Sequence, residues 1–147
     1  MKVNIGKYPQ HWPWSNWLYD KFGYSPQQKV KVHIDKWDTW SMDHTLAPII
    51  LPMLKQLKET KHGAPYVDPD DCPKDLRPKE QNEYGTDDTH FARWDWVLDE
   101  MIYAFDCKAN KDDVWMRLED REEIDKEQKR ISNGFRLFGK YYEALWD

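Results

Sequence analysis

Three stretches of the chain repeat their apolar residues at helical spacing, and this periodicity limits the possible folds more than any other feature. These stretches lie within residues 37–63, 88–107 and 120–146. Two shorter ones, 1–5 and 29–34, alternate apolar and polar residues, as a strand with one buried face does. We therefore expect a helix-dominated α+β fold, in which a small N-terminal two-stranded sheet packs on a bundle of about three helices.

Both strands fall within residues 1–36, where they flank an aromatic-rich loop. In that loop Ser15 is expected to cap a short helix that ends before Gly23. The second strand carries lysines on the face expected to meet solvent. The side chains expected to face inward from it are Val30, Val32 and Ile34.

The first long helix contains Pro48 and Pro52, each of which removes one backbone hydrogen bond. We expect a kink there, or a helix that begins near Pro48. Residues 64–87 are rich in proline and acids and predict a loop. The apolar face expected for the second long helix is Phe91, Trp94, Leu98, Met101, Ile102 and Phe105.

The third long helix has the 4-3-4-3 spacing of a helix-packing seam. The seam consists of Ile124, Ile131, Phe135, Phe138, Tyr142 and Leu145. Gly134 and Gly139 lie in the same helix, where glycine lowers helix stability by about 1 kcal/mol relative to alanine. We expect them to permit the close approach of another helix or a ligand.

Length and composition fit one folded domain over residues 1–147. A charged fraction of 33% and a mean hydropathy of −1.00 would suit disorder, but aromatic residues make up 15% of the chain and include nine tryptophans. The aromatic surplus is expected in a pocket or a subunit contact, which predicts a homo-oligomer, most simply a dimer. The formal charge of −5 argues against nucleic acid as a partner. No segment resembles a signal peptide or a membrane span, so a soluble cytoplasmic protein is expected.

Residues 37–44 hold two indoles, two carboxylates, two hydroxyls and an imidazole. Flat rings suit stacking, and the free N–H groups at a helix start attract anions. This block predicts a site for a flat, charged ligand such as a nucleotide. The ligand-binding residues expected in it are Trp37, Asp38, Trp40, Ser41, Asp43 and His44. An alternative interpretation makes the tryptophans core anchors and the acids and serine helix caps.

Three cations complete the predicted ligand site: Arg93, Arg136 and Lys140. The last two share a helix face, which solvated surface charges also do. Asp95 and Asp99 share a face in the same way and could hold Mg²⁺ beside a phosphate, as helix carboxylates do in all-α nucleotide pyrophosphohydrolases. The further acids of that pattern are missing, so a solvated acidic face is the favoured interpretation. No catalytic motif is found, and no cofactor is expected outside this alternative.

Three sequence blocks resemble a family of small proteins encoded by tailed bacteriophages. The blocks are KVHIDKWDTWSMDHTLA (31–47), RWDWVLDEMI (93–102) and NGFRLFGKYY (133–142). The resemblance covers the chain from Lys29 onward, and this chain is shorter than the family over 108–126. It implies a phage origin and thus a place in the host cytoplasm, and it carries no catalytic residue over to this chain.

These features predict a phage protein that binds a small phosphorylated or nucleotide-like ligand without turnover. Small phage proteins without enzyme motifs often inhibit host processes, which suggests that the ligand is a sequestered host immune signal. Two alternatives stay open. One is a metal-dependent nucleotide hydrolase, and the other is a protein–protein interaction module acting on a host or phage partner.

Overall fold

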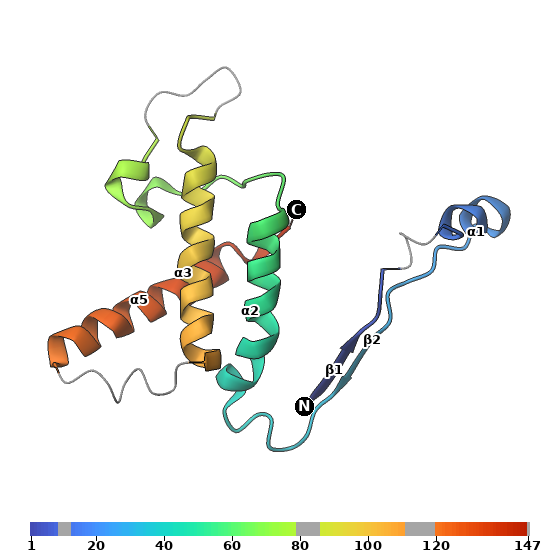
Figure 1. The fold of residues 1–147 in the computed structure, drawn as a ribbon, viewed down its shortest axis with the longest axis horizontal. Coiled ribbons are helices and arrows are strands. Elements are labelled where there is room, and N and C mark those ends of the chain that lie inside the picture. The colour runs from blue at the N-terminus through green and yellow to red at the C-terminus, as the bar shows by residue number, and fades with distance from the viewer. Residues whose placement is uncertain (9–12, 79–85, 111–119, 147) are drawn as a thin grey trace. The chain divides into compact units, whose positions relative to one another are not determined.

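A computed structural model describes residues 1–8, 13–78, 86–110 and 120–146. Figure 1 shows helices in most of the chain and a two-stranded sheet at the N-terminus, which confirms the helix-dominated α+β class. The chain divides into two compact units, Met1–Met42 and Asp43–Asp147, called here the N-terminal and C-terminal units. Each is described by itself, and the single domain expected from the sequence stays a prediction.

The sheet of the N-terminal unit is an antiparallel ribbon of β1 (Lys2–Ile5) and β2 (Val30–His33). Cross-strand partners share a face of such a ribbon. One face carries Val3, Ile5, Val30 and Val32, and the other carries Lys2, Asn4, Lys31 and His33. The expectation of inward-facing apolar side chains on β2 is wrong, because Val30, Val32 and Ile34 are 56, 55 and 52% exposed. A ribbon of two strands brings no second layer of its own to cover them.

Helix α1 (Ser15–Phe22) lies between the two strands in sequence. Gly23 ends it with φ +62°, and its N–H donates to the carbonyl of Tyr19 at 2.8 Å, as a C-terminal glycine cap does. The predicted end is therefore confirmed. Ser15 is not the cap but the first helical residue, and Trp14 precedes it without a capping side-chain bond. The exposed rings of this region are Trp14, Trp17, Tyr19, Phe22 and Tyr24.

In the C-terminal unit, helix α2 (Met42–Thr60) is five residues shorter at its start than the predicted span from residue 37. Both Pro48 and Pro52 lie inside it, so a helix beginning near Pro48 is wrong. Each proline leaves the carbonyl four residues earlier without its usual helical donor. The buried side chains of α2 are Ala47, Leu51 and Leu54.

Helix α3 (His90–Asn110) shares one hydrophobic core with α2 and α5 (Arg121–Lys140). Its fully buried apolar side chains are Trp94, Val97, Leu98, Met101 and Ala104. They cover more of the helix circumference than the predicted stripe, because α3 has neighbours on more than one side. Phe91, predicted in that stripe, is 55% exposed. Val67, from the loop after α2, is also buried in this core.

Helix α5 (Arg121–Lys140) is followed by a short 3-10 turn, η4 (Tyr142–Ala144), and so ends before the predicted residue 146. Its buried residues, together with the residue that ends it, are Ile131, Gly134, Leu137 and Tyr141. Phe135 and Phe138 are half-buried and meet the ring of Phe105 edge-on at 5.1 and 4.9 Å. Tyr142, predicted in the seam, is 64% exposed. The packed face is therefore turned relative to the predicted seam.

Gly134 explains why the packed face of α5 is rotated relative to the predicted seam. A Cβ atom added there would lie 2.4 Å from the carbonyl oxygen of Glu100 and 2.6 Å from the Cβ of Ala104, both in α3. The main chain of α5 thus reaches α3 only because residue 134 has no side chain. The predicted close approach is confirmed at Gly134 and is wrong at Gly139, where a Cβ would meet nothing within 4 Å.

Replacing Gly134 by alanine should lower the free energy of unfolding by about 1–3 kcal/mol, because the added methyl group must push the two helices apart. Gly139→Ala is the matched control in the same helix. It should leave stability unchanged or raise it by up to about 1 kcal/mol through helix propensity. Urea denaturation followed by circular dichroism measures both. Equal effects of the two substitutions would contradict the close approach.

Candidate ligand-binding site

Trp37 and Trp40, the two indoles of the predicted site, lie in the turn that follows β2. Their ring centroids are 6.1 Å apart and their planes are inclined by 56°. The side chains are 65 and 82% exposed, so the interpretation that makes them core anchors does not hold. Two accessible flat faces within one turn can stack on a planar ligand.

Asp38 holds this turn in place. Its carboxylate accepts from the ammonium group of Met1 at 2.6 Å and from the backbone N–H of Asp35 at 2.7 Å. The hydrogen bond from the ammonium group is the main reason why the pKa of Asp38 lies below its usual value. The N–H of Trp37 also donates to the Asp35 carboxylate at 3.1 Å. Asp38 therefore positions the two tryptophans, and its carboxylate already accepts hydrogen bonds from other groups of the protein.

Lys36 lies beside these indoles, with its Nζ atom 5.1 Å from the centroid of the Trp37 ring. A cation over an indole face is attracted by the electron density of the ring. An anionic group of a ligand stacked on Trp37 would lie within reach of this ammonium group. The sequence interpretation missed Lys36, although its place next to Trp37 was the available signal.

The remaining residues of the predicted block are divided between the two units. Ser41 precedes α2, whereas Asp43 and His44 lie in the first turn of α2 and join it to the end of α3. The Asp43 carboxylate accepts from Lys108 at 2.8 Å, and this contact lowers its pKa. The Nδ1 atom of His44 lies 3.0 Å from the carbonyl oxygen of Lys108. Asp43 and His44 thus support the packing of two helices.

Arg93 is buried, with 2% of its surface exposed. Its guanidinium donates to both carboxylate oxygens of Asp87 at 2.9 and 2.8 Å, to the Thr89 hydroxyl at 2.6 Å and to the Leu76 carbonyl at 3.1 Å. The hydrogen bond from Arg93 is the largest cause that holds the pKa of Asp87 well below its usual range. This charge ties the start of α3 to the preceding loop.

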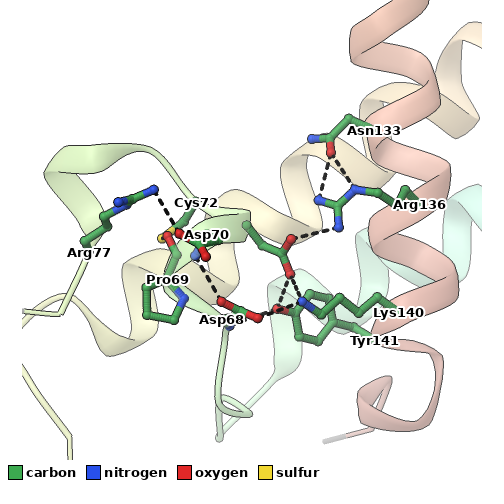
Figure 2. A network of polar contacts seen from close by, with 10 residues as sticks. Asp68, Pro69, Asp70, Cys72, Arg77, Asn133, Arg136, Lys140 and Tyr141 are labelled. Atoms are coloured by element: carbon green, nitrogen blue, oxygen red, sulfur yellow. Dashed lines mark hydrogen bonds and ion pairs between the residues drawn. The ribbon is translucent and has the colours of Figure 1, made fainter.

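Arg136 and Lys140 come together on the carboxylate of Asp71, which is 6% exposed. Arg136 reaches it at 2.8 Å, Lys140 at 2.5 Å, and the Tyr141 hydroxyl donates to it at 2.7 Å. Figure 2 shows the side chains of Arg136 and Lys140, from α5, and of Tyr141, which follows it, directed toward the loop that carries Asp68. Asp68 accepts from Lys140 at 3.0 Å. Arg136 and Lys140, both predicted to contact a ligand phosphate, therefore hold this loop against α5 instead.

Burial and hydrogen bonding have opposite effects on the pKa of Asp71. Burial raises the pKa of Asp71, but the hydrogen bonds from Lys140, Tyr141 and Arg136 outweigh burial, and the carboxyl titrates below its ordinary value. Burial and the bond to Asp71 raise the pKa of Tyr141 to about 12. Asp71 was missed by the sequence interpretation, because no spacing distinguishes it among the acids of its loop.

Asp95 and Asp99, the residues of the hydrolase alternative, each pair with a lysine from the end of α2 or from just after it. Lys61 lies 2.5 Å from Asp95, and Lys58 lies 2.5 Å from Asp99. Both carboxylates are partly exposed, which agrees with the solvated acidic face that the sequence favours, and the structure adds the two salt bridges. Within residues 1–8, 13–78, 86–110 and 120–146, no group of three His, Cys, Asp or Glu side chains could hold a metal ion.

A shallow hollow of roughly 540 Å³ lies beside α3. Its lining includes Lys55, Trp96, Asp99, Glu100, Tyr103, Asp106 and Arg130. Glu100, which is buried, accepts three hydrogen bonds from Arg130 at 2.8 to 3.1 Å, and the guanidinium lies 3.6 Å from the Tyr103 ring centroid. Because its charged groups already pair with one another or with neighbours, this hollow offers less to a charged ligand than the exposed turn.

No protein-family model, curated protein or solved structure matches this chain. Among the described residues, no helix is long and apolar enough to cross a membrane.

Replacing Asp71 by alanine should lower the free energy of unfolding by about 2–3 kcal/mol. This lies at the lower end for a broken buried ion pair, because Arg136 and Lys140 are half-exposed and can turn toward water. Asp70→Ala is the control in the same loop, and its side chain is 86% exposed, so a change below about 0.5 kcal/mol is expected. Thermal and urea unfolding compare the two, and similar losses would contradict the anchoring role of Asp71.

The Asp87–Arg93 pair should make stability depend on acidity. The folded protein holds the pKa of Asp87 below its unfolded value near 4, so the pair stabilises the fold above about pH 4. This contribution is lost as the pH falls through the lower, folded value. We expect the stability difference between the wild type and Asp87→Asn to be constant near neutrality and to shrink below about pH 4. A difference that does not change between neutral and strongly acidic pH would exclude this linkage.

Proposed function

We propose that the protein binds a flat, negatively charged ligand of the nucleotide class without turnover, through the turn of residues 35–41. One observation carries this proposal. The indoles of Trp37 and Trp40 are exposed 6.1 Å apart in a turn fixed by Asp38, with Lys36 over one of them. An exposed pair of large rings is costly to leave in water and usually marks a binding surface.

The cation that meets the ligand differs from those the sequence suggested. Arg93, Arg136 and Lys140 are each paired with a carboxylate of the C-terminal unit. Lys36 has no carboxylate partner among the described residues. The proposed site therefore keeps Trp37 and Trp40 and takes its positive charge from Lys36.

Binding without turnover is favoured over hydrolysis by the contacts of Asp95 and Asp99. A carboxylate that binds Mg²⁺ must offer its oxygens to the ion, but Asp99 is paired with Lys58 and Asp95 with Lys61. The resemblance to phage proteins supports a further part of the proposal: the ligand is a host immune signal, which the protein sequesters in the host cytoplasm. A homodimer belongs to the same proposal.

A second candidate, a protein–protein interaction module, is supported by the apolar face of the ribbon. Ile5, Val30 and Val32 are each more than half exposed on one face. Exposed apolar side chains grouped in this way are typical of surfaces that meet another protein. In this alternative, the partner is a host or phage protein, and the indoles of Trp37 and Trp40 contribute to the same interface.

Trp40→Ala should weaken nucleotide binding about ten- to hundredfold, the loss expected for one stacked base. Tyr66→Ala is the matched control, because Tyr66 is 66% exposed in the C-terminal unit. Calorimetry with nucleoside mono-, di- and triphosphates and cyclic nucleotides measures affinity, and chromatography of the released ligand shows whether it is unaltered. Normal binding by a folded Trp40→Ala variant, or no binding to any nucleotide, would refute the proposal.

A further inference from the structure

Charge is divided unevenly along the chain. The first 42 residues contain six lysines and three aspartates and no other charged side chains, a formal charge of +3. Residues 43–147 contain the other 16 basic and 24 acidic side chains, a formal charge of −8. The overall charge of −5 therefore hides a basic N-terminal unit.

The lysines of this unit are also available. Among the described residues, none of Lys2, Lys7, Lys21, Lys29, Lys31 and Lys36 pairs with a carboxylate. The C-terminal unit contrasts with this, because nine of its basic side chains, Lys55, Lys58, Lys61, Arg77, Arg93, Lys108, Arg130, Arg136 and Lys140, are in ion pairs. Unpaired lysines gain most from an anionic partner, because no internal contact has to be broken first.

Aromatic rings accompany these lysines at both ends of the ribbon. At one end, after β2, Lys36 lies over Trp37. At the other end, in the connection between β1 and β2, the Nζ atom of Lys21 lies 5.1 Å from the Trp17 centroid and 5.7 Å from the Phe22 centroid. The polar face of the ribbon between them carries Lys2 and Lys31.

From this arrangement we infer that the N-terminal unit binds single-stranded nucleic acid, with bases stacked at both ends of the ribbon and phosphates along its lysine face. The inference rests on the proposed function, because it extends the Trp37–Trp40 site from one nucleotide to several. Two separated stacking sites joined by unpaired cations match a strand better than a single nucleotide. Proteins that bind single strands combine aromatic stacking with a cationic track in this way.

The chemistry favours a single strand over a duplex. Stacking on an indole requires a base whose face is free, and in a duplex the neighbouring base pairs cover both faces. A phosphate chain met by lysines also gives binding that weakens with salt, with a slope of log K against log salt of about −0.7 per neutralised phosphate for single strands. Contacts from Lys2, Lys21, Lys31 and Lys36 would give a slope of about −3.

The test uses the full chain and a fluorescent oligothymidylate of about twelve nucleotides, a length within the range of known single-strand sites. Anisotropy should show binding at least about tenfold tighter than that of thymidine monophosphate measured by calorimetry, and tighter than that of a duplex of the same length. Trp17→Ala and Trp40→Ala should each weaken oligonucleotide binding about tenfold. Both side chains are exposed, 54 and 82%, so neither variant removes a core residue.

Lys31→Gln serves as a second, structurally mild variant. It should reduce the salt slope by about 0.7, whereas Lys74→Gln, which changes an exposed lysine of the C-terminal unit, should not. Tyr66→Ala again controls for the loss of an exposed ring.

The outcomes separate the two proposals. Binding of the monophosphate as tight as that of the oligonucleotide, with no effect of Trp17→Ala, would overturn the strand and leave the nucleotide site standing. Binding of neither would refute both. Displacement of the oligonucleotide by an equal phosphate concentration of inorganic polyphosphate would overturn the inference too, because charge alone would then suffice, as it would for an acidic protein surface.

Discussion

The main chains of α3 and α5 meet at Gly134, and the polar contacts that α5 makes with its neighbours depend on that meeting. A helix is rigid over such a length, so fixing Gly134 against Glu100 and Ala104 also fixes the residues over the next two turns of the chain. Arg136, Lys140 and Tyr141 are thereby delivered to the buried carboxylate of Asp71. One turn earlier, Arg130 is delivered to Glu100. A larger residue at 134 would move all of these donors together.

This dependence explains why the basic side chains of α5 are engaged internally. A carboxylate as buried as that of Asp71 is stable as an anion only with close donors. Two of them, Arg136 and Lys140, come from α5, and the third, Tyr141, is the residue that ends it. Arg93 does the same for Asp87 at the start of α3. The C-terminal unit thus satisfies its buried charges from within. Among the described residues of the N-terminal unit, only Ser15 is buried, no lysine pairs with a carboxylate, and large rings such as Trp17 and Trp40 are exposed.

The sequence could predict what depends on local pattern. Periodicity located the long helices and both strands, and Gly23 marked the end of α1. Periodicity predicted the wrong packing face for α5, because it gives weight to the hydrophobic Phe135 and Phe138 and none to Gly134. The missing side chain of Gly134 nevertheless decides how closely α5 approaches α3. The sequence interpretation assigned Arg136 and Lys140 to a ligand because their partner, Asp71, lies more than 60 residues away with no pattern to link them. The exposure of Val30 and Val32 was also unpredictable, since alternation indicates two different faces but not that one is covered.

Net charge is a poor guide to local binding for a related reason. A formal charge of −5 predicts weak binding of nucleic acid, but a charge acts at a surface only within about one Debye length, roughly 8 Å at physiological salt. Carboxylates such as Asp95, Asp99 and Asp71 are largely neutralised by the cations they pair with. The positive charge of Lys2, Lys31 and Lys36 has no such partner among the described residues. Within the N-terminal unit, the local charge of the ribbon is therefore positive, which the net charge of the whole chain does not reveal.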